Sequence, residues 1–167
     1  MKEKRTYRGA GTKTFAKLGG FRNLLTWQRA DDLAEVIYRV TGRLGPGHGR
    51  LCDQMRGAAI SVTGNIAEGH ARGALGDYIR FCEIARASLA ELGTYIQDCE
   101  RWRLTSGEEL DELISLYGET SYLLNQLLRS LYKKHREGTW ERELHEGSPP
   151  YNAQTSPPHP SDEEASS

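Results

Sequence analysis

Hydrophobic residues between positions 24 and 131 recur at intervals of three and four, which is the period of an amphipathic α-helix. The first run predicts a helix that follows an N-cap at Asn23 and ends at Gly42. Charged and amide side chains occupy the opposite side of its helical wheel. The apolar face consists of Trp27, Ala30, Leu33, Ala34, Ile37 and Val40.

The second run, from about residue 48 to residue 69, predicts a helix with two distinct faces. Its apolar face consists of Leu51, Cys52, Met55, Ala58, Ala59, Val62 and Ile66. Another side carries a strip of mostly small residues, namely Gly57, Ile60, Ser61, Gly64 and Ala67. Glycine inside a helix costs about 1 kcal/mol relative to alanine, so two on one side favour the close approach of another backbone. We therefore predict that a second copy of the chain docks on this strip.

Two further helices follow, over about residues 75–101 and from Ser106 to just before Gly138. The third has a buried stripe made of Leu75, Tyr78, Ile79, Cys82, Ala85, Leu89, Leu92, Ile96 and Cys99. Ile84 and Ala87 point away from that stripe and indicate a second contact surface. The fourth opens with Ser106-Gly-Glu-Glu109, the pattern of a capping box. Its stripe consists of Leu110, Leu113, Ile114, Tyr117, Leu124, Leu127, Leu128 and Leu131.

Because no segment alternates as a strand does, the sequence predicts an all-α protein, an antiparallel up-down four-helix bundle over residues 21–137. Residues 1–20 form a glycine-interrupted basic arm with a net charge of +5, which we expect to be flexible. Residues 138–167 form a Pro-rich acidic tail with a net charge of −5 and few aliphatic side chains. Such a tail cannot bury enough apolar area to offset its ordering entropy, so we expect it to be disordered.

Composition narrows the class of protein further. With 22 basic and 23 acidic residues, the 167-residue chain has a formal charge of −1, which excludes a globally basic nucleic-acid binder. It contains no apolar run long enough for a membrane span and no signal-peptide core, so we expect a cytoplasmic protein without a membrane partner. The three cysteines form no CxxC pair, and all lie on predicted core stripes as reduced thiols.

The sequence contains no pattern typical of a catalytic or metal site. Di-metal bundles use Glu-x-x-His pairs, and none occurs here. The chain also lacks a nucleophile elbow and a phosphate-binding G-K-[ST] loop. We therefore predict a protein that is not an enzyme and needs neither a metal nor a cofactor.

The remaining candidate chemistry is phosphate binding by cations. In the arm the candidates are Lys2, Lys4, Arg5, Arg8, Lys13 and Lys17. In the second and third helices they are Arg50, Arg56, Arg72, Arg80 and Arg86. The alternative is that these arginines pair on the surface with Glu68, Asp77, Glu83 and Glu91.

Several strings of residues carry a family resemblance. They are Trp27-Gln28-x-Ala30, Gln54-x-Arg56-x-Ala58-Ala59-x-Ser61-Val62, Asn65-Ile66-Ala67-Glu68-Gly69 and Arg80-Phe81-x-x-x-Ala85-Arg86-x-Ser88-Leu89-x-Glu91-Leu92. Together they resemble the four-helix-bundle proteins encoded in intervening sequences of 23S ribosomal RNA, over about residues 21–133. The chain is also similar, more loosely, to the accessory variability determinant of diversity-generating retroelements.

The resemblance implies a ring-like homopentamer without catalysis that binds RNA or an RNA-bound reverse transcriptase. Because the folded part is nearly neutral, the arm is the main source of positive charge, and five copies would display about +25. We expect Asn65, Glu68 and Gly69 to form a hydrogen-bonded hub with Arg72, Arg80 or Arg86 at the turn between the second and third helices. We expect Trp27 to anchor the bundle core or the subunit interface.

Two hypotheses follow. The first is a homo-oligomeric adaptor, a retroelement accessory protein in type, that binds RNA or an RNA-bound reverse transcriptase. The second is a protein-interaction scaffold that binds no nucleic acid, which the near-neutral bundle and the acidic tail favour.

Overall fold

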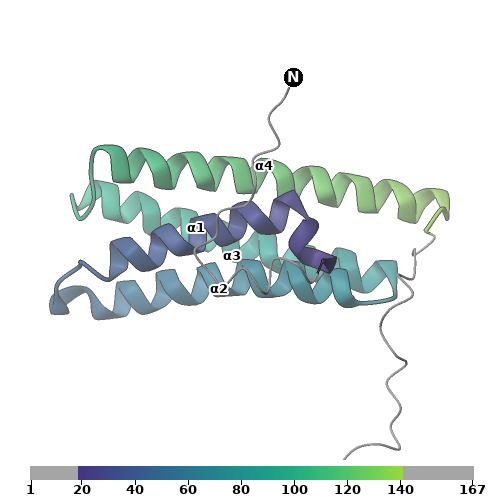
Figure 1. Cartoon of the computed structure of the whole chain (residues 1–167), viewed down its shortest axis with the longest axis horizontal. Helices are drawn as coiled ribbons and strands as arrows, with labels where there is room; N and C mark the ends of the chain where they lie inside the picture. Colours follow the sequence, from purple (N-terminus) through teal and green to yellow (C-terminus); the bar gives the residue numbers. More distant parts are fainter. Residues whose placement is uncertain (1–18, 141–167) are drawn as a thin grey trace, which may run out of the picture.

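A computed structural model describes residues 19–140, and four long antiparallel helices dominate it (Figure 1). They are α1 (Leu25–Thr41), α2 (Gly49–Ala71), α3 (Leu75–Arg101) and α4 (Glu108–Glu137). Two 3-10 turns, η2 (Gly20–Asn23) and η3 (Pro46–His48), precede α1 and α2. The predicted all-α four-helix bundle is thus confirmed. In Figure 1, α4 and α2 run along opposite edges of the bundle, and both run in the same direction.

The core contains the stripes that the sequence predicted for α2 and α3. All nine stripe residues of α3 are buried, and on α2 only Leu51 remains partly exposed. The centre is formed by Ile37, Met55, Ile66, Leu92, Leu113 and Leu124. Each buried aliphatic side chain contributes roughly 1.5–3 kcal/mol to folding, so these stripes hold the bundle together.

On α4 the predicted stripe is wrong at one position. Ile114 is 48 % exposed, whereas Thr120, which the stripe left out, is fully buried. Ile114 lies about 100° around the helix from Leu113, which faces the core, and is thereby rotated to the outside. The Thr120 hydroxyl has no hydrogen-bond partner among the described residues.

Both predicted N-caps differ from the observed ones. Asn23 belongs to η2, and the N-cap of α1 is Leu24, whose side chain makes no cap bond. The N-cap of α4 is Gly107, with φ of +60°, so Ser106 lies one residue too early to cap the helix. The Thr105 hydroxyl instead donates to the Glu109 carboxylate at 3.1 Å. A turn residue with positive φ has thus displaced the predicted capping box.

The packed part of the chain continues beyond α4, to Trp140. The sequence placed residues 138–140 in the tail, but the Trp140 ring lies 6.2 Å from that of Tyr78, and its Nε1 donates to the Gly73 carbonyl at 3.3 Å. Gly138, in the left-handed conformation at φ +63°, makes the turn that returns the chain to the bundle. The rest of the predicted arm and tail, residues 1–18 and 141–167, lies outside the described residues.

Within the described range, no helix is both long and apolar enough to cross a bilayer.

Candidate nucleic-acid and subunit interfaces

The turn between α2 and α3 depends on one close approach between the two helices. A Cβ atom on Gly69 would lie 2.9 Å from Cβ of Phe81 and 2.9 Å from Cδ2 of Tyr78. Real Cβ contacts are not that short, so only glycine allows α2 to pack this closely on α3. The motif glycine therefore has a packing role at this turn.

Midway along the same two helices, a small polar cluster joins them. The hydroxyl oxygens of Ser61 and Ser88 lie 2.8 Å apart across the contact. Asn65 Nδ2 donates to the carbonyl of Ser61 at 2.7 Å and to its hydroxyl at 3.1 Å. All three residues belong to the motif strings, so we name this line of α2–α3 contact, from Gln54 and Tyr95 to Gly69 and Phe81, the seam.

The turn end of the seam carries the predicted ion pair. Arg72 pairs with Glu68, and its guanidinium lies 5.0 Å from the centre of the Phe81 ring. Arg72 was one of the three partners predicted for Glu68. The expected hub is nevertheless divided, because Asn65 bonds to Ser61 rather than joining this pair.

The opposite end of the seam carries a further polar cluster. The Tyr95 hydroxyl donates to the Glu91 carboxylate at 2.7 Å and to Gln54 Oε1 at 3.3 Å. The hydrogen bond to Glu91 raises the pKa of Tyr95, since ionisation would bring two negative groups together. Polar side chains therefore join α2 to α3 along the length of the seam.

Three of the five bundle arginines proposed for phosphate contact are engaged within the bundle. Arg56 donates to the Thr41 hydroxyl at 2.8 Å and lies 5.3 Å from the Tyr38 ring centre. Arg86 donates to the Glu83 carboxylate at 2.8 Å, and Arg72 pairs with Glu68 as described. For Arg72 and Arg86, the surface pairing considered as the alternative is therefore what the structure contains.

Arg50 and Arg80 differ from the other three. Both are exposed, and neither makes an ion pair or hydrogen bond with another described residue. Arg80 lies in the second turn of α3, at the end of the bundle where α2 and α4 finish. Of the five candidates, it is the one best placed to meet a phosphate near that end.

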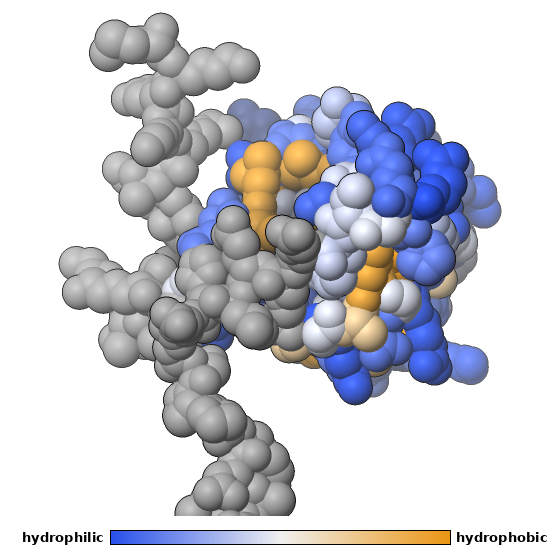
Figure 2. Space-filling model, turned by 90° about the vertical axis from the view of Figure 1, so that its right-hand side faces the viewer, coloured by the Kyte–Doolittle hydropathy of each residue, from blue (hydrophilic) through white to orange (hydrophobic). Residues whose placement is uncertain are grey.

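Further cations, which the candidates predicted from the sequence did not include, lie at that end. They are Lys133, Lys134 and Arg136 in the last turns of α4, where positive charge also complements the helix dipole. We call the group of Arg72, Arg80, Lys133, Lys134 and Arg136 the basic end. Figure 2, which views the bundle from this end, shows mainly hydrophilic residues around a few hydrophobic ones. One of these cations lies against Trp140, whose ring centre is 5.4 Å from Lys134 Nζ.

The predicted subunit surface is open in the single chain. No heavy atom outside their own helix lies within 4 Å of where a Cβ of Gly57 or Gly64 would be. Beside them Ile60 is 53 % exposed, while Ile84 on α3 is 39 % exposed and Ala87 is also exposed. The outward positions predicted for Ile84 and Ala87 are thus confirmed, and the strip on α2 has no neighbour in the described part of its own chain.

Trp27 is engaged in its own chain. It is partly buried against the core, and its ring lies 5.1 Å from that of Phe21 in an edge-to-face arrangement. This contact holds η2 against the start of α1. Of the two roles predicted for Trp27, the arrangement fits the core anchor.

The cysteines lie where a nucleophile would be inactive. All three are buried, and burial raises the pKa of Cys82 to about 12 and that of Cys99 to about 11. At neutral pH both are therefore protonated thiols, and the thiolate is the reactive form. Among residues 19–140, no group of three or more His, Cys, Asp or Glu side chains is arranged to hold a metal ion.

Fold and seam together define a class: a four-helix-bundle protein whose motif residues join the second helix to the third. The model of one family, the 23S rRNA-intervening sequence protein, matches residues 22–126. The chain belongs to this family. The match spans α1 to α3 and much of α4, and it ends before the cations of α4 and Trp140. Among curated proteins, none matches the chain.

Proposed function

We propose that this chain is a non-enzymatic, homo-oligomeric adaptor that binds RNA, either directly or as part of an RNA-bound reverse transcriptase complex in the cytoplasm. Family membership supports an RNA-related role. The observation that carries the proposal further is the basic end, where Arg80, Lys134 and Arg136 are all exposed and all lie in the half of the bundle where α1 begins.

The basic arm, residues 1–20, adds further positive charge near the basic end. It joins the bundle through η2, which contacts both the start of α1 and α2. Its net charge of +5 is therefore tethered to the half of the bundle that contains the basic end. Phosphate contacts release counterions, so binding through these groups weakens steeply as salt rises.

Fluorescence anisotropy with a labelled single-stranded RNA at increasing salt tests this proposal. Deletion of residues 1–18 and the double variant Arg80→Glu/Arg136→Glu should each weaken binding at least fivefold and flatten the salt dependence. The matched control Arg101→Glu/Arg103→Glu changes the same charge at the far end of the bundle and should alter binding less than twofold. Equal losses in the two double variants would contradict binding at the basic end.

The homo-oligomer is the second part of the proposal, and the pentamer is its specific form. Support comes from Gly57, Gly64 and Ile60, which leave a flat, partly apolar strip uncovered on α2. Light scattering should give a molecular mass five times the 18.7 kDa of one chain. A mass of 18.7 kDa at tens of micromolar protein would contradict any stable oligomer.

A protein-interaction scaffold that binds no nucleic acid is the second candidate. The observation that favours it is the pairing of Arg72 and Arg86 with acidic neighbours, which leaves fewer cations for phosphate. Protein purified at low salt discriminates the two functions through its absorbance ratio at 260 and 280 nm. Co-purified nucleic acid favours the adaptor, and a clean oligomer favours the scaffold.

A further inference from the structure

One exposed aromatic side chain lies in the part of α4 that the family match does not cover. Tyr132 is 44 % exposed, and its hydroxyl donates to the Glu83 carboxylate on α3 at 2.8 Å. The family match ends at residue 126. The hydrogen bond places the phenol ring across the junction of α3 and α4, and part of the residue remains open to solvent.

On α4, two arginines share the side of the helix that carries Tyr132. Arg129 precedes it by three residues and Arg136 follows it by four. From the rise of an α-helix, they stand about 4.5 Å and about 6 Å from it along the helix axis. Both are exposed, and neither forms an ion pair or hydrogen bond with another described residue. Both guanidinium groups are therefore accessible to a ligand that lies over the tyrosine.

On α3, two more arginines flank the acceptor of the tyrosine hydroxyl. Arg80 and Arg86 are each three residues from Glu83, one turn to either side of it. Arg86 donates to the Glu83 carboxylate at 2.8 Å, while Arg80 has no ion-pair partner in the described part of the chain. We call the whole set the tyrosine patch, which consists of Tyr132, Arg80, Arg86, Arg129 and Arg136.

The tyrosine patch is positive although a carboxylate lies within it. Four arginines against Glu83 leave a net charge of +3, and the neighbouring Lys133 and Glu137 pair with each other at 3.9 Å. The Glu83 carboxylate accepts hydrogen bonds from both Tyr132 and Arg86, so its charge is already paired. The bond to Glu83 also raises the pKa of Tyr132, which keeps the phenol protonated at neutral pH. A neutral aromatic ring therefore faces solvent among cations.

Proteins hold unpaired nucleotides with this combination of groups. A base stacks its flat face on an aromatic side chain, and cations around it contact the phosphates on either side. In a duplex, neighbouring base pairs cover both faces of each internal base, so no side chain can stack there. We propose that the tyrosine patch binds single-stranded RNA, with one unpaired base stacked on Tyr132 and the flanking phosphates on Arg129 and Arg136. This inference rests on the proposed RNA binding and specifies the form of the RNA and the side chain that contacts a base.

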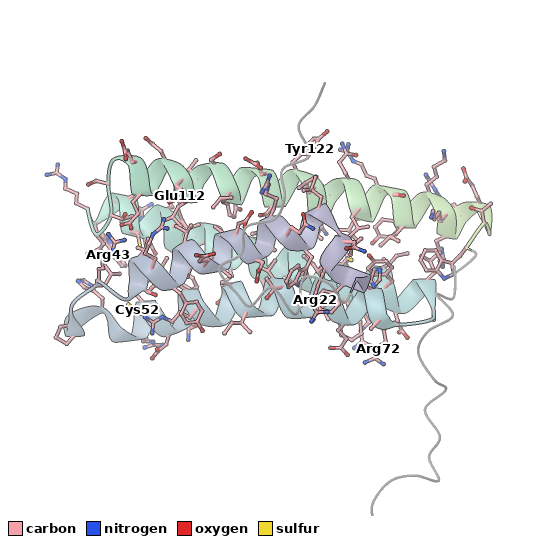
Figure 3. The ribbon with its side chains drawn as sticks, in the orientation of Figure 1. Arg22, Arg43, Cys52, Arg72, Glu112 and Tyr122 are labelled. Carbon is pink, nitrogen blue, oxygen red and sulfur yellow. The ribbon has the colours of Figure 1, made fainter. Side chains whose placement is uncertain are left out.

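Tyr122 on the same helix provides a comparison. It is 64 % exposed, more than Tyr132, and it points away from the other helices (Figure 3). Glu119 is the one charged residue three or four positions from it along α4, and it is an acid. Because no arginine accompanies this ring on its helix, Tyr122 serves as the matched control.

Two substitutions at Tyr132 separate stacking from its other contacts. Tyr132→Leu keeps an apolar side chain but removes the aromatic face, and Tyr132→Phe keeps the face but removes the bond to Glu83. Fluorescence anisotropy with labelled single-stranded RNA should show affinity weakened about fivefold or more by Tyr132→Leu, and less than about twofold by Tyr132→Phe. Tyr122→Leu should also change affinity less than about twofold. Circular dichroism verifies that all three variants are helical.

The salt dependence of binding distinguishes the ring from the cations. Tyr132→Leu removes no charge, so its affinity should fall with salt as steeply as that of the wild type. Arg129→Gln should weaken binding and flatten the salt dependence, because one phosphate contact is lost. An unchanged affinity in Tyr132→Leu, or an equal loss in Tyr132→Phe, would overturn the stacking. An unchanged salt dependence in Arg129→Gln would overturn the phosphate contact.

The form of the RNA gives an independent test. The wild type should bind the single strand about fivefold or more tightly than a blunt duplex of the same length or a single strand of abasic nucleotides, because neither offers the face of an unpaired base. Equal affinity for the abasic strand or the duplex would overturn the inference and leave phosphate binding at the basic end intact. A wild type that binds none of the three RNAs would instead overturn the proposed RNA binding, and this inference with it.

Discussion

The hydroxyl oxygens of Ser61 on α2 and Ser88 on α3 lie 2.8 Å apart, at the midpoint of the seam. Asn65 donates to the same Ser61 hydroxyl at 3.1 Å, so one motif string bonds to another through two short side chains. Short polar side chains let the two backbones approach, while the bonds between them fix the register of the helices. The spacing of these motif residues along the chain thus follows from the contact of α2 with α3.

The Ser61–Ser88 bond predicts a measurable coupling. Ser88→Ala should lower the free energy of unfolding by about 0.5–1.5 kcal/mol, because a partly buried hydrogen bond is lost. In a double-mutant cycle with Ser61→Ala, the second change should cost less than it does alone. Denaturant unfolding at fixed protein concentration measures all four proteins. Strictly additive losses would show that the hydroxyls do not interact.

The packing of Gly69 predicts a larger effect. Gly69→Ala should destabilise the protein by about 1–3 kcal/mol, since its Cβ would overlap both Phe81 and Tyr78. Gly76→Ala is the matched control, because no neighbouring atom stands within 4 Å of the new Cβ. That variant should be as stable as the wild type or slightly more stable. Thermal unfolding followed by circular dichroism separates the two, and equal stabilities would contradict the close approach.

Periodicity predicted the stripes of α2 and α3 because those helices face the core along a continuous line. Ile114 shows where the rule fails: it lies beside Leu113 in sequence, but the core selects only one of the two. Thr120 occupies the interior although its hydroxyl is polar, because the helix places that position inward. Hydrophobicity identifies which residues can be buried, and the rotation of the helix determines which ones are.

The candidate site was less predictable from sequence. The sequence identifies the arginines but not the groups with which they form ion pairs or hydrogen bonds. Those partners depend on which side chains the neighbouring turn or helix brings close. Arg86 meets Glu83 three residues earlier, while Arg56 reaches Thr41 on another helix. The packing of Trp140 was not predicted for a related reason. The proline-rich, acidic composition is an average over residues 138–167, and it does not reveal that one aromatic residue of this segment packs on Tyr78.

The turn between α3 and α4 predicts a stabilising substitution. Arg103 has φ of +56°, a left-handed conformation that side chains rarely adopt. Its amide donates to the Glu100 carbonyl at 3.0 Å, and the Leu104 amide donates to the Cys99 carbonyl at 2.8 Å, the two bonds of a Schellman motif. Arg103→Gly should raise the free energy of unfolding by about 0.5–1 kcal/mol. Arg103→Ala keeps the Cβ and should bring no such gain.

Burial of Cys82 predicts a loss of stability in alkali. Its pKa is about 12 in the folded protein, compared with the ordinary thiol value of 9.0 in the unfolded chain. Between these two values the unfolded chain releases the thiol proton while the folded protein keeps it. The unfolded state therefore binds fewer protons, and the free energy of unfolding falls as pH rises above about 9. The contribution of this thiol is fully present below that pH.

Denaturant unfolding between pH 8 and pH 10.5 measures the effect. In this range Cys82→Ala should lose less stability than the wild type does, by on the order of 1 kcal/mol, because alanine releases no proton. Val36→Ala also truncates a buried side chain but has no titrating group, so it should lower stability equally at every pH. Parallel pH profiles for wild type and Cys82→Ala would mean that the thiol is accessible to water in the folded protein, contrary to its complete burial.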